Sequence, residues 1–496
     1  MEQTESRLGR WTKQGMRFLK WLLYSAGIGL LVGGVAAAFH LGIDWAAELR
    51  AREPWILWLL PVGGMAIVLL YRVCRMEKDQ GTNLVLAAVR EAEPLKLRTA
   101  PLIFLSTIVT HLVGGSAGRE GAALQLGGSM AAWVGREIRL DAKDSRVMVM
   151  CGMSAAFSAL FGTPLTAVCF SMEVVSVGVM YYAALVPCVV ASLTALQVAQ
   201  GFGLHQSPGY EIGRVLGLGP VSMVQTAALG LLCALVSILF CKVLHTAPKL
   251  YAKYFPNPLL RAAAGGALVL ALTLLVGSQD YNGAGDGVIR RMLAGETIPE
   301  AFLMKILFTA LTLGAGFRGG EIVPVLFTGA AFGTTVGPLL GLPHGFGGAL
   351  GMAAVFCGAT NCPMTALMLA FELFGGESLT LYAVCCGVSY MLSGYYGLYS
   401  EQKIVYSKFR TEWIDKKARL PLVQRKIEGE LTALPGPGGE TEIAALPDQD
   451  TPGEIEAQAQ PILLPHSRAP VEAGKDLSLL LLWDAGAAVR DPDAAK

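Results

Sequence analysis

Residues 162–174 read GTPLTAVCFSMEV, and residues 361–373 read NCPMTALMLAFEL. The two stretches share a Pro-x-Thr-Ala pattern, followed at the same distance by a glutamate, Glu173 in the first and Glu372 in the second. We predict that the chain consists of two homologous halves, offset by about two hundred residues. The alternative is chance similarity, because apolar sequences draw on few residue types.

A glycine-rich, charged break lies upstream of each repeated stretch. Residues 114–121 read GGSAGREG, and residues 314–324 read GAGFRGGEIVP. Glycine and proline interrupt helices, and a charge within apolar sequence is costly in lipid unless it faces water, a partner or a substrate. Repeated halves with interrupted helices are typical of transporters that hold their substrate near the middle of the bilayer.

The composition indicates a chain embedded in a lipid bilayer. Of its 496 residues, 53% are hydrophobic and 16% are charged, whereas soluble domains are about 25% charged. Apolar stretches long enough to cross about 30 Å of hydrocarbon recur along the chain. They are residues 21–39, 55–73, 221–239 and 262–276. We predict an all-α polytopic membrane protein with a transmembrane domain at residues 18–402, in halves of about 18–200 and 221–402.

Basic residues flank this domain on both sides. They are Arg7, Arg10, Lys13, Arg17 and Lys20 before it, and Lys403, Lys408, Arg410, Lys416, Lys417 and Arg419 after it. Because basic flanks stay in the cytoplasm, we expect an inner-membrane protein whose flanks at residues 1–17 and 403–419 are both cytoplasmic. The first apolar stretch lacks the cleavage site of a signal peptide. Residues 420–496 are rich in Pro, Gly, Glu and Gln, which predicts a disordered tail.

Glu120 is the candidate for the chemistry of transport. It follows Arg119 in the first break, at the start of a helix-like run. Helix N-termini attract anions, so an ionised carboxylate on the same turn fills such a site itself and gives it up when protonated. We predict that Glu120 gates an anion pathway. The alternative is a buried Arg119–Glu120 salt bridge or an extramembrane loop, and the second break, with Arg318 and Glu321, weighs against it.

These motifs resemble those of the CLC chloride channels and antiporters. GREGA at residues 118–122 is similar to the family's GREGP, GGEIVP at 319–324 to its GxFxP region, and the segment at 151–174 to a long segment of the same pattern. They occur in the family's order, and the resemblance covers about residues 20–405. It implies an inverted-repeat helical bundle with broken helices, which forms a homodimer with one pore in each subunit.

The resemblance also assigns roles by position. Glu120 matches the family's gating and proton-carrying glutamate, and Glu321 and Glu173 are accessory candidates. The anion-binding candidates are Gln80, Gly81, Thr82, Gly118, Arg119, Gly121, Ile322, Val323 and Tyr399. The backbone N–H groups of Ile322 and Val323 would face the anion, and the hydroxyl of Tyr399 would donate to it. For Tyr399, the alternative is an ordinary hydrogen bond between helices.

Three departures from the family pattern bear on the anion. Gln80 in DQGTN (residues 79–83) stands where the family has an anion-binding serine, and Val174 stands where chloride/proton antiporters have an internal glutamate. Gln80 and Val323 also differ from the methionine and threonine of the fluoride/proton branch. We expect transport of a small anion, with chloride slightly favoured and fluoride/proton antiport as the alternative. The sequence fits both a channel and an antiporter, because the same gating carboxylate serves in both.

Two other classes of function fit less well. A membrane-embedded enzyme would use the buried carboxylates as acids or bases, but the sequence has no HExxH, nucleophile elbow or phosphate loop. A cation-coupled transporter of another fold would not explain the ordered CLC motifs. We expect no cofactor and no metal, because the cysteines lie in apolar sequence without metal-ligand spacing. A net charge of +1 argues against a nucleic-acid partner.

Overall fold

The computed structural model describes residues 7–77, 79–91, 94–204, 210–410 and 412–417. Its first half contains α1 (Arg7–Arg52), η1 (Pro54–Leu59), α2 (Leu60–Val73), α3 (Thr82–Glu91), α4 (Thr99–Leu112), α5 (Glu120–Glu137), α6 (Ala142–Phe161), α7 (Pro164–Glu173), β1 (Ser176–Val177), η2 (Tyr182–Ala184) and α8 (Leu185–Gly201). The second contains α9 (Pro220–Tyr254), α10 (Pro258–Val276), α11 (Asp286–Leu293), α12 (Ala301–Gly314), α13 (Ile322–Val336), η3 (Pro338–Leu340), α14 (His344–Thr360), α15 (Pro363–Phe374) and α16 (Leu379–Leu392). Two strands follow, β2 (Lys403–Tyr406) and β3 (Trp413–Lys417).

The helices confirm the predicted all-α membrane class. Within the described residues, five helical stretches are long and apolar enough to cross a bilayer. They are Gln14–Arg52, Pro54–Val73, Tyr182–Gly201, Pro220–Tyr254 and Pro258–Val276. Other apolar helices, including α4, α12 and α13, are shorter, as expected where helices are interrupted within the membrane.

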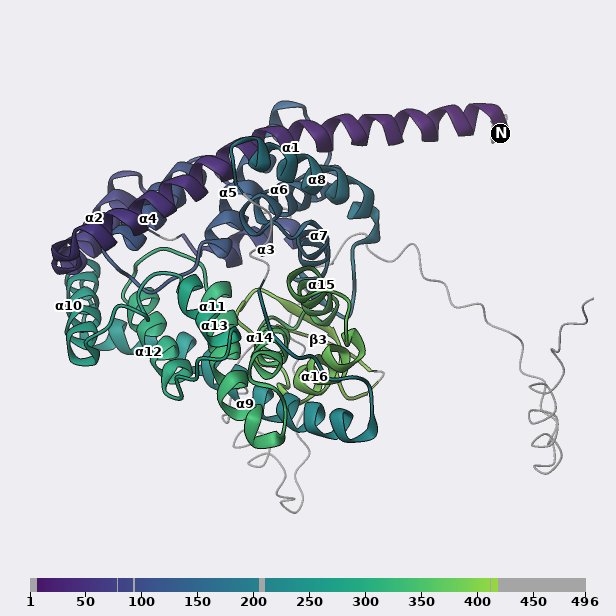
Figure 1. Cartoon of the computed structure of the whole chain (residues 1–496). Helices are drawn as coiled ribbons and strands as arrows, with labels where there is room; N and C mark the ends of the chain where they lie inside the picture. Colours follow the sequence, from purple (N-terminus) through teal and green to yellow (C-terminus); the bar gives the residue numbers. More distant parts are fainter. Residues whose placement is uncertain (1–6, 78, 92–93, 205–209, 411, 418–496) are drawn as a thin grey trace, which may run out of the picture. The chain divides into compact units, whose positions relative to one another are not determined.

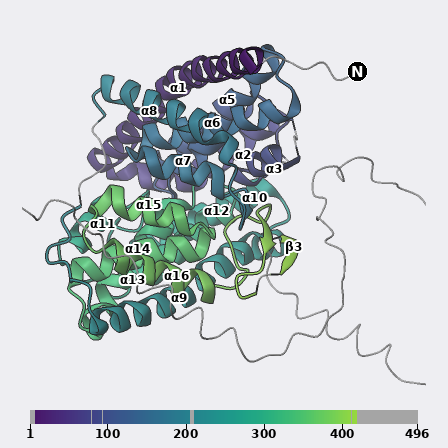
Figure 2. The same ribbon diagram turned by 90° about the vertical axis from the view of Figure 1, so that its right-hand side faces the viewer.

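The two halves have the same order of helices and the same packing. In the first half α1 packs on α4, α6 and α8, and in the second half α9 packs on α12, α14 and α16. The pair α5 and α6 likewise corresponds to α13 and α14. The halves lie side by side in both views, with α7 against α15 where they meet (Figures 1 and 2). The predicted repeat is therefore a repeat of structure.

The two sequence breaks meet inside the molecule. α4 ends at Leu112 before α5 begins, and α12 ends at Gly314 before α13 begins. In the gaps between these helices, Gly118 and Gly320 form an antiparallel bridge, and each N–H donates to the other's carbonyl oxygen at 2.7 Å. A Cβ on Gly320 would lie 2.5 Å from the backbone nitrogen of Gly121, so only glycine allows this approach.

A reciprocal exchange of carboxylates also joins the halves. Glu173, at the end of α7, accepts from the backbone N–H groups of Met364 (3.1 Å) and Thr365 (2.8 Å) at the start of α15. Glu372, on α15, accepts from the N–H groups of Leu165 and Thr166, both at 2.8 Å, at the start of α7. Each carboxylate therefore caps the N-terminus of the other half's helix, which favours a negative charge there.

The segment that follows α16 is folded. β2 pairs with β1 in parallel and with β3 in an antiparallel arrangement, giving a small three-stranded sheet. The basic flank expected at residues 403–419 thus contributes two strands over its described part. The expected tail at residues 420–496 lies outside the described residues.

The two carboxylate caps predict that removing either one lowers the stability of the protein. Glu173→Gln and Glu372→Gln each leave an amide N–H group facing a backbone N–H donor. A hydrogen bond to a charged group contributes about 1.5 to 3 kcal/mol, and we expect a smaller loss at Glu372, which is less buried. Thermal unfolding in detergent measures both losses, with the exposed Glu377→Gln as the control. Equal melting temperatures in all three variants would contradict the capping role.

Candidate functional site

The first break places Glu120 at the positive end of a helix. Glu120 is the first residue of α5 and is fully buried. Its Oε2 accepts from the backbone N–H of Arg119 at 3.1 Å, and its Oε1 lies 3.6 Å from Arg119 Nε. Oε1 has no hydrogen-bond partner among the described residues. The carboxylate is therefore hydrogen-bonded through Oε2 and ion-paired with Arg119 through Oε1, and it lies where a helix N-terminus attracts an anion.

The second break places another carboxylate close by. Glu321 is the N-cap residue of α13, and the first two residues of that helix, Ile322 and Val323, are buried. Backbone N–H groups in the first turn of a helix have no partner within the helix. The oxygen Oε2 of Glu321 is buried and accepts no hydrogen bond from the described part of the chain. The Gly118–Gly320 bridge thus brings together two helix N-termini, each with its own glutamate.

Thr82 and Gln125 complete one side of this site. Thr82, the first residue of α3, donates from its hydroxyl to the carbonyl oxygen of Gly121 at 3.3 Å. Gln125 Nε2, one turn further along α5, donates to the same oxygen at 3.3 Å and to Thr82 Oγ1 at 3.4 Å. A Cβ on Gly121 would lie 3.1 Å from Glu321 Oε2 and 3.3 Å from Thr82 Oγ1. These groups are therefore immediate neighbours.

Tyr399 approaches from the segment between α16 and β2. Its side chain is 2% exposed, and within the described structure its hydroxyl has no hydrogen-bond partner. The CLC resemblance implies that this hydroxyl donates to the anion, so we group Tyr399 with the residues around the Gly118–Gly320 bridge. We refer to Thr82, Glu120, Gln125, Glu321 and Tyr399 as the polar cluster. Buried polar atoms are nearly always satisfied in proteins, so several unsatisfied ones in one place mark a site.

Arg119 pairs with Glu120 and also reaches charged groups outside the polar cluster. Its guanidinium contacts His40 Nε2 at 3.1 Å and Asp44 at 3.4 Å, both on α1, and lies 3.9 Å from Asp286 at the start of α11. A cavity of about 440 Å³ borders Arg119, Asp44 and Asp286, and Arg50 and His111 also line it. Arg119 therefore connects Glu120 to a charged vestibule.

The other predicted site residues differ in whether they lie at the polar cluster. Gln80 is exposed. Gly81 turns the chain with a φ of +66° and lies close to Gln125, since a Cβ on Gly81 would be 3.6 Å from Gln125 Nε2. The loop therefore brings Thr82, and not Gln80, into the polar cluster. Glu173 is buried, but both of its oxygens cap α15. Its contacts are structural.

Sequence reasoning missed Gln125 and the partners of Arg119. Gln125 is a single polar residue in the apolar run GAALQLGG, and that isolation was the available signal. His40, Asp44 and Asp286 gave no signal, because they lie far from Arg119 in sequence and only the fold brings them to it.

Comparison with known proteins decides the family. The model of the family described as voltage gated chloride channel matches residues 62–394. The chain belongs to this CLC family. A chloride/fluoride channel protein of Pseudomonas syringae pv. tomato is 38% identical over 396 residues, which cover 78% of this chain and 87% of the relative. An H(+)/Cl(-) exchange transporter ClcA of Yersinia pestis is 23% identical over 388 residues, 73% of this chain and 81% of the relative.

Solved structures of CLC proteins have the same fold. A crystal structure of a CLC-type fluoride/proton antiporter superposes with a TM-score of 0.74 at 31% identity, covering 80% of this chain and 99% of that chain. A slow cyanobacterial Cl-/H+ antiporter superposes with a TM-score of 0.63 at 19% identity, covering 75% and 94%. The predicted inverted-repeat CLC architecture is confirmed. The chain is thus a multi-pass membrane protein of an anion transport family, and that family is not one of enzymes.

The geometry predicts which side chains an anion requires. Thr82→Val and Tyr399→Phe each remove a hydroxyl from the polar cluster with little change in shape. We expect each variant to bind the transported anion about 10- to 100-fold more weakly, because a hydrogen bond to a charged group is worth about 1.5 to 3 kcal/mol. Gln80→Ala should leave the affinity unchanged, since Gln80 is exposed.

Isothermal titration calorimetry of the purified protein with fluoride and with chloride measures these affinities. Tyr395→Phe is the matched control, because the Tyr395 hydroxyl bonds to Ser407 at 2.9 Å and not to the polar cluster. A large loss in Gln80→Ala, with wild-type affinity in Thr82→Val, would reverse the assignment of the donor.

Proposed function

We propose that this protein exchanges fluoride for protons across the inner membrane, with Glu120 as the group that carries the proton and gates the pathway. The observation that carries the proposal is the pair of buried glutamates, Glu120 and Glu321, beside two helix N-termini and the neutral donors Thr82, Gln125 and Tyr399. Donors and helix ends attract an anion, whereas ionised carboxylates repel it.

Electrostatics then links the anion to a proton. Two like charges 4 Å apart repel by about 4 kcal/mol at an effective dielectric constant of 20. An anion can therefore enter the polar cluster readily only when Glu120 has taken up a proton and has left the helix N-terminus. Ionised Glu120 excludes the anion, and protonated Glu120, displaced from the helix N-terminus, admits it, so the carboxylate and the anion occupy the site in turn. Alternating use of one site supports exchange.

Three observations support fluoride as the anion. Fluoride is small and strongly hydrated, so its site needs short, strong donor contacts. The hydroxyl of Tyr399 can provide one, and that of Thr82 can provide another when it turns from the carbonyl oxygen of Gly121 to the anion. Two similar proteins, at 38% and 31% identity, are described as a chloride/fluoride channel protein and a fluoride/proton antiporter. Gln80, whose departure from the fluoride branch favours chloride, is exposed and lies outside the polar cluster. Glu321 would act as an accessory proton acceptor, since Val174 offers none.

Chloride/proton exchange is the second candidate. Val323 is buried in the first turn of α13 and adds no hydroxyl donor there, which suits the larger and less hydrated chloride ion. The relative described as an H(+)/Cl(-) exchange transporter also supports it, at 23% identity.

We also propose a homodimer with both termini in the cytoplasm. The CLC resemblance supports the dimer, and the basic residues before and after the membrane domain support the orientation. Subunit counting by single-molecule photobleaching should give two per particle. Reporter fusions after residue 417 should be active only as cytoplasmic reporters.

A flux experiment tests the proposed exchange. Wild-type protein in proteoliposomes should move protons inward against their gradient when fluoride flows outward. Glu120→Gln should abolish this proton movement and leave passive anion flux, because the neutral amide imitates the protonated acid. Proton pumping that persists in Glu120→Gln would refute the role of Glu120.

The same vesicles decide between the two anions. We expect fluoride efflux to be at least about tenfold faster than chloride efflux at equal gradients. Val323→Thr, which adds a hydroxyl beside the α13 N-terminus, should increase this preference further. Chloride efflux that is the faster of the two and drives proton uptake would establish the second candidate.

A further inference from the structure

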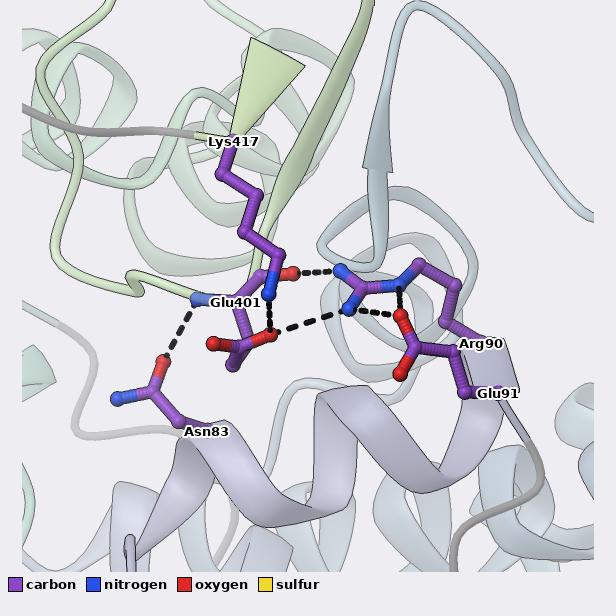
Figure 3. A network of polar contacts seen from close by, with 5 residues as sticks. All are labelled: Asn83, Arg90, Glu91, Glu401 and Lys417. Atoms are coloured by element: carbon purple, nitrogen blue, oxygen red, sulfur yellow. Dashed lines mark hydrogen bonds and ion pairs between the residues drawn. The ribbon is translucent and has the colours of Figure 1, made fainter. Parts of the chain in front are cut away.

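Glu401 lies two residues after Tyr399 and is tied to three positions in the chain (Figure 3). Its backbone N–H donates to Asn83 Oδ1 at 3.2 Å, and its backbone carbonyl accepts from Arg90 Nη1. Its carboxylate oxygen Oε2 accepts from Arg90 Nη2 at 3.0 Å and from Lys417 Nζ at 2.6 Å. We refer to Asn83, Arg90, Glu401 and Lys417 as the Glu401 network.

The network holds α3 at both of its ends. Asn83 lies in the first turn of α3, directly after Thr82, and Arg90 lies in its last turn. Figure 3 shows both side chains reaching from this helix to the segment at Glu401. The arginine is also fixed on its other side by the carboxylate of Glu91. Residue 401 is therefore fixed relative to the helix that carries Thr82.

The neighbouring residues Gln402 and Leu398 bond to other parts of the chain. Gln402 Nε2 donates to the carbonyl oxygens of Val174 (2.9 Å) and Thr360 (2.8 Å), and Gln402 Oε1 accepts from Asn361 Nδ2 at 3.0 Å. The backbone N–H of Leu398 donates to Ala359 at 2.8 Å. Tyr399 thus lies in a short segment that Gln402 joins to α7 and α14, while Glu401 joins it to α3.

Lys417 brings the last described strand into this arrangement. It ends β3, where it pairs in register with Lys403 of β2. Its ammonium group is partly buried against Glu401. A carboxylate shared by an arginine and a lysine in a partly buried position is more strongly held than an exposed pair, because less water screens the charges.

We propose that Glu401 is a positioning residue for anion binding, and that Lys417 makes β3 part of the support of the transport pathway. The Glu401 network sets the separation between the hydroxyls of Thr82 and Tyr399, which approach the polar cluster from two elements. A small ion requires these donors close together, and a larger ion tolerates a wider spacing. Loosening the network therefore weakens fluoride binding more than chloride binding. This inference rests on the proposed anion transport function.

Variants that remove or keep one charge of the Glu401 network test the positioning role. Glu401→Gln and Lys417→Ala each remove one charge from the network and keep the backbone contacts of residue 401. We expect each to lower the ratio of fluoride to chloride affinity, measured by calorimetry, at least about fivefold. Lys417→Arg should keep the wild-type ratio, because it retains the cation. Glu412→Gln is the control, since Glu412 and its partner Arg410 are both exposed.

A double-mutant cycle separates positioning from a general loss of stability. If Glu401 acts through the two hydroxyls, Glu401→Gln should have no further effect on anion affinity in the Thr82→Val, Tyr399→Phe background. Additive effects, or a lowered melting temperature with an unchanged affinity ratio, would overturn the proposal.

This proposal and the proposed function can fail separately, because different measurements test them. Wild-type binding and flux alone decide whether the transported anion is fluoride or chloride. If it is chloride, non-additivity measured with chloride still supports the Glu401 network, and additivity still refutes it.

Discussion

The contact between Gly118 and Gly320 is the constraint on which the rest of the structure depends. It joins equivalent residues of the two halves by a pair of 2.7 Å hydrogen bonds, and it satisfies backbone groups that lipid could not. Because the bridge is antiparallel, α5 and α13 start beside each other. Two sets of unsatisfied helix N–H groups then converge in the interior, where a negative charge is stabilised. The repeated helices and the carboxylate caps of α7 and α15 hold this geometry.

Equivalent positions around the bridge have diverged in charge. Arg119 is the N-cap residue of α5, and Glu321 is the N-cap residue of α13. Arg119 meets Asp286 at the start of α11, whereas Glu321 is a close neighbour of Thr82 at the start of α3. The Arg119 cation is thus surrounded by carboxylates from both halves, whereas the Glu321 carboxylate lies beside the neutral side chain of Thr82. A duplicated backbone therefore supports a charged vestibule on one side and, as we propose, a proton-dependent binding site on the other.

Much of the fold could be predicted from the sequence, because the signals were local or repeated. The repeated Pro-x-Thr-Ala stretches, the glycine-rich breaks and the apolar runs indicated two halves of interrupted helices, and Glu120 stood out as a charge between glycines. Residues whose surroundings come from distant segments were harder to assign. Gln80 aligns with a binding serine but is exposed, and Glu173, an accessory candidate beside Val174, caps a helix. Gln125 was missed because its partner Thr82 lies 43 residues away in sequence.

The central claim is that the anion and ionised Glu120 exclude each other from one site. Proton uptake on anion binding tests it most directly, measured by titrating fluoride into the purified protein in buffers of different ionisation enthalpy. We expect uptake of up to about one proton for each anion bound at neutral pH, and none in Glu120→Gln. Anion binding to the wild-type protein without any proton uptake, at a pH where Glu120 is ionised, would contradict it.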